Sequence, residues 1–511
     1  MSHQPSPAVD SSPIRERVRL PLLIRVLPHL KDHCFEGKTI LPAVDILQQL
    51  AGSLMTHRPD ADIRCMQSAS FGHFLLTKQD TDYIDDLYHE LEFRDSGRIS
   101  SRLISEAKIR GTGITRTKVH AAVDFATKGR HPASIPMDIA AALEGVCYKS
   151  TSQALYDDLV PFGPAYHNVR GDVYLSESGG IAQVYAAMHP APSEPLGSPF
   201  PLDGAFHVAC AWGQRYLHCV VFPVGFEERF IVLPTVPGEL YSCRILPTSI
   251  TGKIVKFDIW IHDRAGCLRE YVRNLIMKDV SGGRVQPPHW IRSERGASLK
   301  LISGHCQAFS LIEVDAVADF AEQALSTAER ERFKSLGRKR QAGFLAGRLA
   351  LKHLARNLAG GDRTTPASEI DTLQQDHIHP CCPVPDSRNE TFCSLSHDSR
   401  FAIAVAGDRE IGVDVEMISD RVMKVRHLFM GDNELSLTEA SPLGVREASL
   451  RVWSIKEGIV KATGKTLEES WRHASIEEIG WHKSRLNVEG VKYAAIHDTE
   501  EGHVFTVIYR E

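Results

Sequence analysis

The stretches IGVDVE (residues 411–416) and WSIKEGIVKATG (residues 453–464) decide the fold of the C-terminal third of this chain. The first alternates apolar and acidic residues, which is typical of a β-strand, and it places Asp414 and Glu416 on one face. Two carboxylates that close repel each other unless one binds a proton or a cation joins them. The strand is therefore either a solvated sheet edge, where charged residues are common, or one wall of a cation site.

The second stretch has the spacing of a helix, which places Trp453, Glu457 and Lys461 along one face. Lys456 points to a neighbouring face. A glutamate four residues before a lysine is commonly a surface ion pair. Beside the two acids of the strand, however, it favours a Mg²⁺ site, because Mg²⁺ takes oxygen ligands and shares itself with substrate phosphates. The lysine would then contact the phosphate oxygens.

The composition is that of an ordinary globular protein and gives no sign of a polyanion-binding surface. Of 511 residues, 43% are apolar and 24% are charged, and the net charge is −5. Eleven cysteines include no C-x-x-C pair, which favours reduced thiols over a disulfide framework. The start, MSHQPSPAVDSSP, lacks the apolar core of a signal peptide, and no apolar run approaches the ~20 residues that cross a membrane. We therefore expect a cytoplasmic protein.

Changes in local composition divide the chain into four parts. Residues 1–14 are polar and rich in Ser and Pro, which is typical of a disordered tail. Residues 15–280 consist mainly of short runs with strand alternation, and residues 281–302 collect Gly, Pro, Ser and Arg as linkers do. Residues 303–511 mix strands with helices, including one or two long helices over 326–357 that open with a capping box. The sequence thus predicts an α+β protein of two domains.

Two further stretches join the first two in a family pattern. They are RKRQAGFLAGRLALK (338–352) and FCSLSHDSRFAIAVAG (392–407). Together the four stretches resemble, in order and over about 200 residues, the 4′-phosphopantetheinyl transferases of the longer type that activates siderophore and lipopeptide synthetases. The resemblance implies a pseudo-two-fold α+β fold and the activity of a holo-[acyl-carrier-protein] synthase.

The resemblance also implies a mechanism. By this likeness Asp414, Glu416 and Glu457 hold Mg²⁺ on the pyrophosphate of coenzyme A, and Glu457 takes the proton of a carrier-protein serine. The serine oxygen attacks the β-phosphate with Lys461 beside it, and 3′,5′-ADP leaves. The residues that the likeness assigns to coenzyme A are Arg348, Ser396, His397, Lys456 and Lys461.

Five positions leave parts of this assignment open. Arg348 could instead be a solvated helix charge, and His397 could be a structural histidine. Gly458 stands where the family has Ala or Ser, which costs the helix ~1 kcal/mol but removes no chemical group. Ser394 stands where Asn is frequent, and Ile378-His379-Pro380 replaces the usual Gly-Lys-Pro, so that one phosphate-binding lysine is absent.

The N-terminal part offers one histidine and one aspartate as candidates for chemistry. HCFEGKTILP (33–42) contains His33, and PLDGAFHVAC (201–210) contains Asp203, with PFGPAYHNV (161–169) between them. A lone histidine before a glycine is commonly structural, and Asp-Gly is commonly a turn. An imidazole facing a carboxylic acid, however, is a base and acid pair able to remove water from a 3-hydroxyacyl thioester.

These spacings resemble the dehydratase domains of polyketide and polyunsaturated fatty acid synthases. The likeness implies a double hotdog, in which each of two long helices is wrapped by an antiparallel sheet. By this likeness His33 abstracts the α-proton, Asp203 protonates the leaving hydroxyl and His207 holds Asp203. Backbone N–H groups near Gly37, at the start of the helix, would polarise the thioester carbonyl. Phe162 takes the family's tyrosine position, so the hydrogen bond of that hydroxyl is absent.

Together the two halves predict an enzyme of polyketide or fatty acid assembly whose partners are acyl carrier proteins. The basic run ERERFKSLGRKR (329–340) would suit an acidic carrier helix, or it is a solvated helix face. Two alternatives stay open: an inactive dehydratase-like scaffold that docks carrier proteins, and a C-terminal half that binds coenzyme A without transfer. The net negative charge and the lack of aromatics in the basic run argue against nucleic-acid binding.

Overall fold

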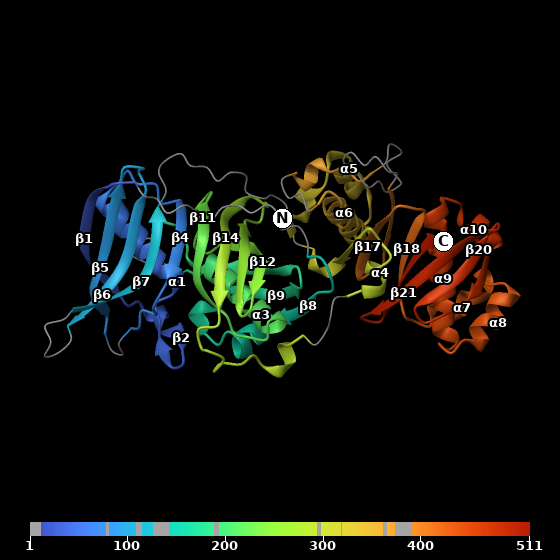
Figure 1. The fold of residues 1–511 in the computed structure, drawn as a ribbon, viewed down its shortest axis with the longest axis horizontal. Coiled ribbons are helices and arrows are strands. Elements are labelled where there is room, and N and C mark those ends of the chain that lie inside the picture. Colours follow the sequence, from blue (N-terminus) through green and yellow to red (C-terminus); the bar gives the residue numbers. More distant parts are fainter. Residues whose placement is uncertain are drawn as a thin grey trace. The chain divides into compact units, whose positions relative to one another are not determined.

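The computed structural model describes residues 12–77, 81–108, 115–125, 143–188, 194–293, 298–317, 319–360, 365–373 and 391–511. The chain forms two compact units, whose elements are labelled in Figure 1. Unit 1 comprises residues up to Ile135 and then Tyr148–Ser293, whereas unit 2 comprises Pro136–Cys147 and Glu294–Glu511. The second unit is therefore built from two separate stretches of chain.

Unit 1 is organised around one antiparallel sheet of twelve strands, in the order β1-β5-β6-β7-β4-β11-β14-β13-β12-β10-β9-β8. The sheet has two halves, which come from the two halves of the unit's sequence and meet where β4 pairs with β11. The strands are β1 Ile14–Arg25, β4 Cys65–Phe71, β5 Tyr83–Arg94, β6 Ile99–Lys108, β7 Thr115–Phe125, β8 Tyr148–Thr151, β9 Val169–Ser176, β10 Gly179–Tyr185, β11 Phe222–Ile231, β12 Leu240–Thr251, β13 Ile254–His262 and β14 Leu268–Lys278.

One long helix lies against each half of this sheet. In α1 (Ala43–His57) buried residues recur at helical spacing, among them Val44, Leu47 and Leu54. Helix α3 (Phe200–Tyr216) is buried along nearly its whole length and packs on β9, β10 and β12. Because each half pairs a buried helix with antiparallel strands, the predicted double hotdog is confirmed.

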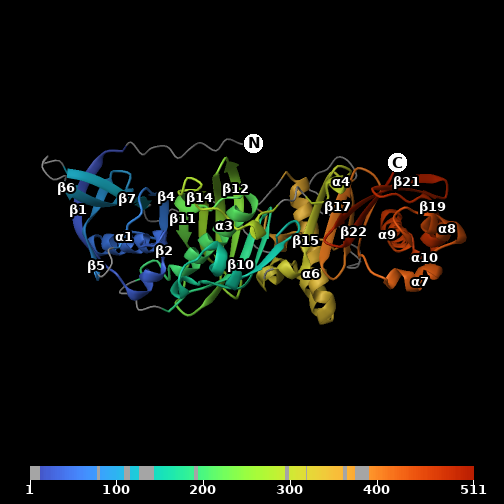
Figure 2. The ribbon, with the colours of Figure 1, turned by 90° about the horizontal axis from the view of Figure 1, so that it is seen from below.

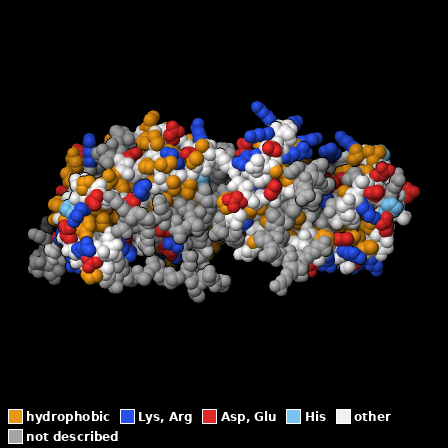
Figure 3. All heavy atoms as spheres, turned by 90° about the horizontal axis from the view of Figure 1, so that it is seen from above, with side chains coloured by type: hydrophobic (Ala, Val, Ile, Leu, Met, Phe, Trp, Pro, Cys, Tyr) orange, Lys and Arg blue, Asp and Glu red, His pale blue; other side chains and the backbone are white. Residues whose placement is uncertain are grey.

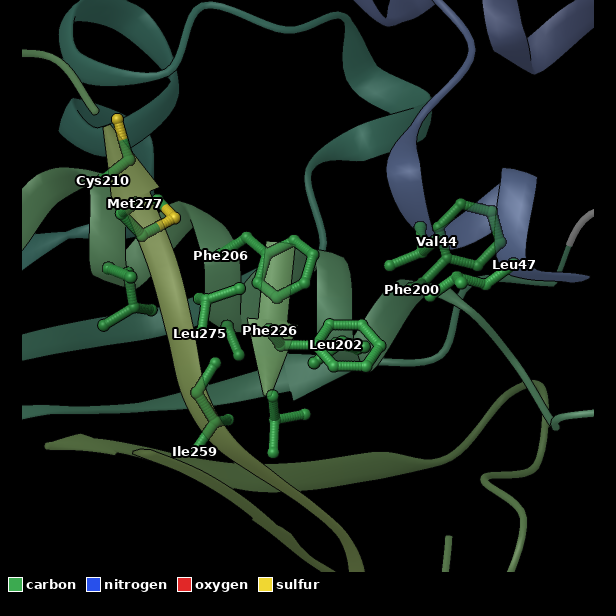
Figure 4. Packing of buried hydrophobic residues seen from close by; sticks show 14 of the residues in the cluster. Val44, Leu47, Phe200, Leu202, Phe206, Cys210, Phe226, Ile259, Leu275 and Met277 are labelled. Carbon is green, nitrogen blue, oxygen red and sulfur yellow. The ribbon is translucent and has the colours of Figure 1, made fainter. Parts of the chain in front are cut away.

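Figure 4 shows the apolar core around the two helices. Phe206 and Cys210 of α3 lie beside Met277 of β14, and Phe200 lies next to Val44 of α1. The first turn of α3 thus packs on the first turn of α1. This contact fixes the start of both helices, and the candidate residue Asp203 lies in the first turn of α3.

Unit 2 contains two antiparallel sheets, β15-β17-β16 and β18-β22-β21-β20-β19. Helix α6 packs on β15 and β17, and helix α9 packs on β18 and β22, so each sheet carries one long helix. The elements are α4 Lys300–Ser303, β15 Ala308–Glu313, α5 Thr327–Ser335, α6 Arg338–Leu358, β16 Phe392–His397, β17 Phe401–Gly407, β18 Ile411–Met417, α7 Arg421–Phe429, α8 Asp432–Ala440, α9 Val445–Thr463, α10 Leu467–His473, β19 Ala474–Glu478, β20 Lys483–Val488, β21 Val491–Glu500 and β22 His503–Arg510.

The two sheets of unit 2 share an apolar core. Val413 and Val415 of β18 pack there with Phe401 of β17 and Phe505 of β22. Strand β18 therefore turns its acidic face to the other side, toward α9, which Figure 2 shows beside α8 and α10. This repeated pairing of sheet and helix is the pseudo-two-fold α+β arrangement that the sequence predicted.

The observed ends of several elements differ from the expected ones. Strand β1 begins at Ile14, and residues 1–11 of the expected tail lie outside the described residues. The expected linker 281–302 contains Ile291 and Ile302, both fully buried, and it belongs to unit 1 as far as Ser293. The expected helical stretch is two helices, α5 and α6, and α5 does open with a capping box.

The tripeptide Ile378-His379-Pro380, which stands in place of the usual Gly-Lys-Pro, lies outside the described residues. Within the part of the chain that the structure describes, no helix is long and apolar enough to cross a membrane.

The junction of β4 and β11 leaves no room for a side chain at Gly225. A Cβ at this position would lie 2.3 Å from the backbone oxygen of Ala69. We expect Gly225→Ala to lower the free energy of unfolding by about 3 kcal/mol, since a backbone cannot yield as a side chain can. Gly52→Ala, within α1, is the control. The heavy atom nearest to its new methyl group would lie 3.9 Å away, and alanine stabilises a helix by ~1 kcal/mol relative to glycine. Equal stability of both variants in urea titrations would contradict this close packing.

Candidate active sites

The site in unit 2 depends on a close contact between strand β18 and helix α9. A Cβ on Gly412 would lie 1.9 Å from the carbonyl oxygen of Gly458 and 2.9 Å from the amide nitrogen of Ala462. Only glycine fits at 412, because both obstacles are backbone atoms. Gly458 also packs tightly, since its Cβ would lie 2.6 Å from Cδ1 of Ile508. The departure from the family's Ala or Ser is thus matched by closer packing.

This contact brings Lys461 of α9 onto Asp414 of β18. The ammonium of Lys461 donates hydrogen bonds to Oδ1 of Asp414 (3.0 Å), Oγ of Ser396 (2.9 Å) and the carbonyl of Val413 (3.0 Å). Ser396 donates in turn to Asp414 Oδ1 at 3.1 Å. Among the described residues none hydrogen-bonds the other oxygen, Oδ2, although Asp414 is buried. One carboxylate oxygen is therefore left for a ligand.

Glu416 is oriented by an aromatic cluster. The indole N–H of Trp453 donates to Glu416 Oε1 at 2.8 Å, and its ring packs against Phe429 and Trp471 with centroids 5.0 and 5.9 Å apart. Burial raises the pKa of Glu416, and the nearby charge of Asp414 raises it further. The same two causes raise the pKa of Glu457. The three acids therefore form one electrostatically coupled cluster.

The carboxylates of Asp414, Glu416 and Glu457 fit a divalent cation in type and charge. All three offer oxygen ligands, which Mg²⁺ prefers, and a cation would relieve the repulsion that raises two of their pKa values. Within the described ranges no three Asp, Glu, His or Cys side chains converge closely enough to form a metal cluster. The reason is local, since Lys461 engages Asp414 and Trp453 engages Glu416.

A positively charged side borders the carboxylates. The ring of His397 lies against two glycines of α6: a Cβ on Gly343 would be 2.9 Å from its Nδ1, and one on Gly347 would be 3.8 Å from its Cδ2. Burial lowers the pKa of His397, and the charges of Lys461 and Arg348 lower it further. The stretch GFLAGR (343–348) thus provides both the space for the imidazole and a neighbouring guanidinium.

Two of the predicted phosphate contacts are engaged inside the protein. Arg348 is buried and donates to the carbonyl of Thr372 at 2.8 Å. Lys456 is buried on the far side of α9, where it donates to the carbonyl of Phe429 and pairs with Glu434 at 2.7 Å. This ion pair holds the ammonium of Lys456 against α8, and its predicted contact with coenzyme A stays a prediction that would require an exchange of partner. Ser394 instead has a structural role, accepting a hydrogen bond from Val413 N–H at 3.0 Å.

The site in unit 1 brings His33 and Asp203 to one cavity of about 260 Å³. Nδ1 of His33 lies 2.9 Å from the carbonyl of Ile40. A carbonyl only accepts, so Nδ1 carries the proton and Nε2 of the neutral ring is the basic nitrogen. Burial lowers the pKa of His33, which keeps the imidazole neutral at pH 7. Its ring packs on Phe162 at 4.2 Å and Tyr166 at 5.0 Å.

Asp203 lies in the first turn of α3 and is held by two partners. Oδ2 lies 3.1 Å from Nε2 of His207 and accepts a hydrogen bond from Asn168 at 3.2 Å. The hydroxyl of Tyr156 accepts a hydrogen bond from the N–H of Val169 and lies 3.2 Å from Nδ1 of His207, with which it shares a further hydrogen bond. Burial raises the pKa of Asp203, but the histidines and Asn168 outweigh it and lower the pKa. At neutral pH the carboxylate must first take up a proton before it can donate one.

The loop containing FGPAY connects the two halves of this site. The N–H of Ala165 donates to Oδ2 of Asp32 at 2.8 Å. The N–H of Gly163 donates to the backbone carbonyl of Asp32, also at 2.8 Å. A Cβ on Gly163 would lie 2.4 Å from Cγ of Asp32. Because Asp32 directly precedes His33, the second hotdog holds the candidate base of the first.

Gly37 has a different place from the one expected. With Glu36 it forms the tip of the hairpin between β2 (Cys34–Phe35) and β3 (Lys38–Thr39), and both residues have positive φ, 48° and 73°. The helix begins only at Ala43. The assignment of Gly37 to the helix start is therefore corrected: the glycine serves a tight turn.

Sequence reasoning missed a second carboxyl near the cavity. Asp45, in the first turn of α1, accepts a hydrogen bond from the hydroxyl of Tyr166 at 3.2 Å. Burial and the charge of Asp203 raise the pKa of Asp45 to about 7. In the sequence, Asp45 stands out only as an acid shortly after the stretch HCFEGKTILP (33–42), at the start of the expected helix.

Comparison with known proteins finds similarities in the C-terminal unit. Residues 410–508 match the model of the 4′-phosphopantetheinyl transferase superfamily. Enterobactin synthase component D of Salmonella austin is 30% identical over 153 residues, which are 30% of this chain and 60% of that protein. The 4′-phosphopantetheinyl transferase gsp of Aneurinibacillus migulanus is 27% identical over 73 residues, 14% of this chain and 31% of that protein. The chain thus spans about 60% of the length of the first of these relatives.

Solved structures resemble the other half of the chain. A dehydratase domain from the CurF module of the curacin polyketide synthase is 14% identical, with a TM-score of 0.41, covering 53% of this chain and 96% of that one. An N-terminal dehydratase of the difficidin assembly line is 15% identical, with a TM-score of 0.40, covering 52% and 94%. We call unit 1 the dehydratase-like unit and unit 2 the transferase-like unit below, as labels taken from the sequence motifs of each unit.

We expect Gly412→Ala to remove the function of the transferase-like unit. The new methyl group would push α9 away from β18 and so separate Glu457 and Lys461 from Asp414. A misplacement of about 1 Å can cost roughly 100-fold in rate, and we expect a loss of that size. Gly431→Ala, with no atom within 4 Å of the new methyl, is the control. Equal rates in the two variants, for the reaction proposed below, would show that this contact does not position the site.

Proposed function

We propose that the transferase-like unit moves the 4′-phosphopantetheine arm of coenzyme A to a serine of an acyl or peptidyl carrier protein. The observation that carries the proposal is the coupled cluster of Asp414, Glu416 and Glu457 beside the cations Lys461 and Arg348. Acids and cations side by side suit a pyrophosphate and a divalent ion. Residues 410–508, which contain the three acids, match the transferase superfamily.

The roles of the individual residues follow from their surroundings. Asp414, Glu416 and Glu457 would hold Mg²⁺, which when bound neutralises charge on the pyrophosphate. Glu457, one helical turn before Lys461 on α9, would take the proton of the carrier serine. The serine oxygen forms a bond to the β-phosphorus, and 3′,5′-ADP leaves with the electrons of the broken bond. Lys461 would exchange an internal hydrogen bond for a phosphate oxygen.

The carrier protein would approach from a basic surface. Arg332, Lys334 and Arg338 to Arg340, on α5 and the start of α6, are exposed. Figure 3 shows Lys and Arg side chains gathered over these helices. Opposite charge steers association, which would favour an acidic carrier helix. The name of one relative, enterobactin synthase component D, supports a partner within a synthase.

Mass spectrometry of an apo carrier protein tests the transfer. With coenzyme A and Mg²⁺ we expect the mass of one phosphopantetheine group to be added, and a chelator to abolish the gain. Asp414→Ala should slow the reaction by roughly 100-fold or more, because the charge stabilisation by a metal is worth several kcal/mol. Glu439→Ala, an exposed acid of α8, should leave the rate unchanged. Transfer that persists with chelator and with Asp414→Ala would refute this assignment.

We further propose that the dehydratase-like unit removes water from 3-hydroxyacyl thioesters. The carrying observation is that His33 and Asp203, from different hotdogs, reach the same cavity. Three further histidines, His73, His120 and His207, also line the cavity. Most of the remaining lining is apolar, with side chains such as Phe35, Phe206 and Met277, which suit an acyl chain. His33 Nε2 would take the α-proton, and Asp203 would contact the 3-hydroxyl that leaves as water.

A scaffold without dehydratase activity is the second candidate, and two observations favour it. Phe162 has no hydroxyl to offer at the family's tyrosine position, and the lowered pKa of Asp203 disfavours the protonated acid. Such a unit would still bind the acyl-pantetheine arm of a carrier protein in the cavity. The two candidates differ in whether enoyl thioester is formed.

The pH dependence of dehydration distinguishes them. His33 acts as a base only when neutral, and burial lowers its pKa below the ordinary value of 6.5. The rate should therefore fall as the pH drops through that lowered pKa, and the midpoint of this acid limb should lie below pH 6.5. Enoyl formation from a 3-hydroxyacyl thioester should vanish in His33→Ala and persist in His57→Ala. No enoyl product at any pH would favour the scaffold, and an acid limb above pH 6.5 would exclude His33 as the base.

A further inference from the structure

A short segment that lies between strands of the dehydratase-like unit in sequence belongs to the transferase-like unit in the fold. Residues Leu143–Cys147, which we call the strap, come directly before β8 but belong to unit 2. Strand β15 is the edge of its three-stranded sheet, and the strap lies along its open side. Gly145 N–H donates to the carbonyl of Leu311 at 2.7 Å, and Glu144 and Ile312 form an antiparallel bridge.

The side chains of the strap pack against the interior of unit 2. Leu143 is fully buried and Cys147 is 6% exposed. Val146 packs on the apolar core that joins the two sheets of unit 2. The backbone N–H of Cys147 donates to Glu313 at 2.8 Å, and Glu313 also accepts from Arg400 at 3.2 Å. Both ends of the segment are thus fixed to β15 and its neighbours.

Glu144 extends the attachment from the sheet to helix α6. Its Oε1 lies 3.6 Å from Nδ1 of His353 and accepts a hydrogen bond from Asn357 at 3.4 Å. Burial opposes ionisation of this carboxyl, yet His353, Ser310 and Asn357 lower the pKa of Glu144 to about 2. Helix α6 also carries Arg348, which lies one and a half turns before His353. The strap therefore holds the helix that borders the transferase site.

An open strand edge is a place where another chain segment adds, since its N–H and C=O groups lack partners. Strand addition uses main-chain hydrogen bonds for affinity and side-chain contacts for specificity. The strap supplies both kinds of contact. We propose that strand β15 is a docking surface whose occupant is the strap of the same chain, and that this internal strand addition links the two halves non-covalently. The transferase-like unit is then incomplete without a segment of the dehydratase half, whatever reaction each unit performs.

A cut between the units tests this link in the full chain. Residues 294–297 are replaced by the recognition sequence of a specific protease, and the folded protein is cleaved there. We expect the two fragments to co-elute in size-exclusion chromatography at the mass of the intact chain. Fragments that separate at micromolar concentration would overturn the proposal.

Strap variants identify what holds the fragments together. Gly145→Pro removes the donor to Leu311, and Glu144→Arg places a cation beside His353. Both should release the fragments after cleavage, whereas Glu177→Arg, a charge reversal in an exposed turn, should not. Co-elution of both strap variants as intact-mass complexes would overturn the proposal, because another contact would then suffice.

The milder variant Glu144→Ala keeps the proposal testable if the stronger ones do not fold. In the uncut protein, hydrogen exchange should rise severalfold in β15 and the C-terminal half of α6 and stay unchanged in β21 of the other sheet. Unchanged exchange in β15 would overturn the proposal. Exchange that rises equally in β21 would do the same, because the strap would then have no specific contact with β15.

Discussion

The repulsion among three carboxylates in a small, partly buried space is the constraint on which the transferase-like unit depends. Asp414 and Glu416 share a face because β18 is a strand, and Glu457 joins them because Gly412 lets α9 touch that strand. The pKa values of Glu416 and Glu457 rise as a result. Lys461 and Trp453 each engage one acid, and these contacts offset part of the repulsion.

In the dehydratase-like unit the surroundings keep one site residue neutral and the other ionised. His33 is kept neutral by burial, and Asp203 is kept ionised by His207 and Asn168. The loop that holds Asp32 next to His33 comes from the other hotdog, so the pair exists only when both halves of the sheet are joined at β4 and β11. In this unit the geometry of the site therefore depends on the stability of the junction between β4 and β11.

The sequence predicted the elements but not their internal partners. Alternation in IGVDVE was enough to place Asp414 and Glu416 on one face, since the period of a strand is fixed. Helical spacing placed Lys456 off that face, but it could not reveal the ion pair with Glu434, which is distant in sequence. For the same reason Asn168, Tyr156 and the strap were not predicted, because each contributes through a long-range contact without a local pattern. Gly37 was misassigned since a glycine before a helix and a glycine in a hairpin look alike in sequence.

Binding of coenzyme A with and without Mg²⁺, measured by calorimetry, tests the central claim most directly. If the three acids are a cation site for a pyrophosphate, Mg²⁺ should tighten binding by roughly tenfold or more. Asp414→Asn, which removes a charge but little volume, should abolish that difference. Equal affinity of the wild-type protein with Mg²⁺ and with chelator would contradict the account, because the carboxylates would then gather for a reason other than a shared cation.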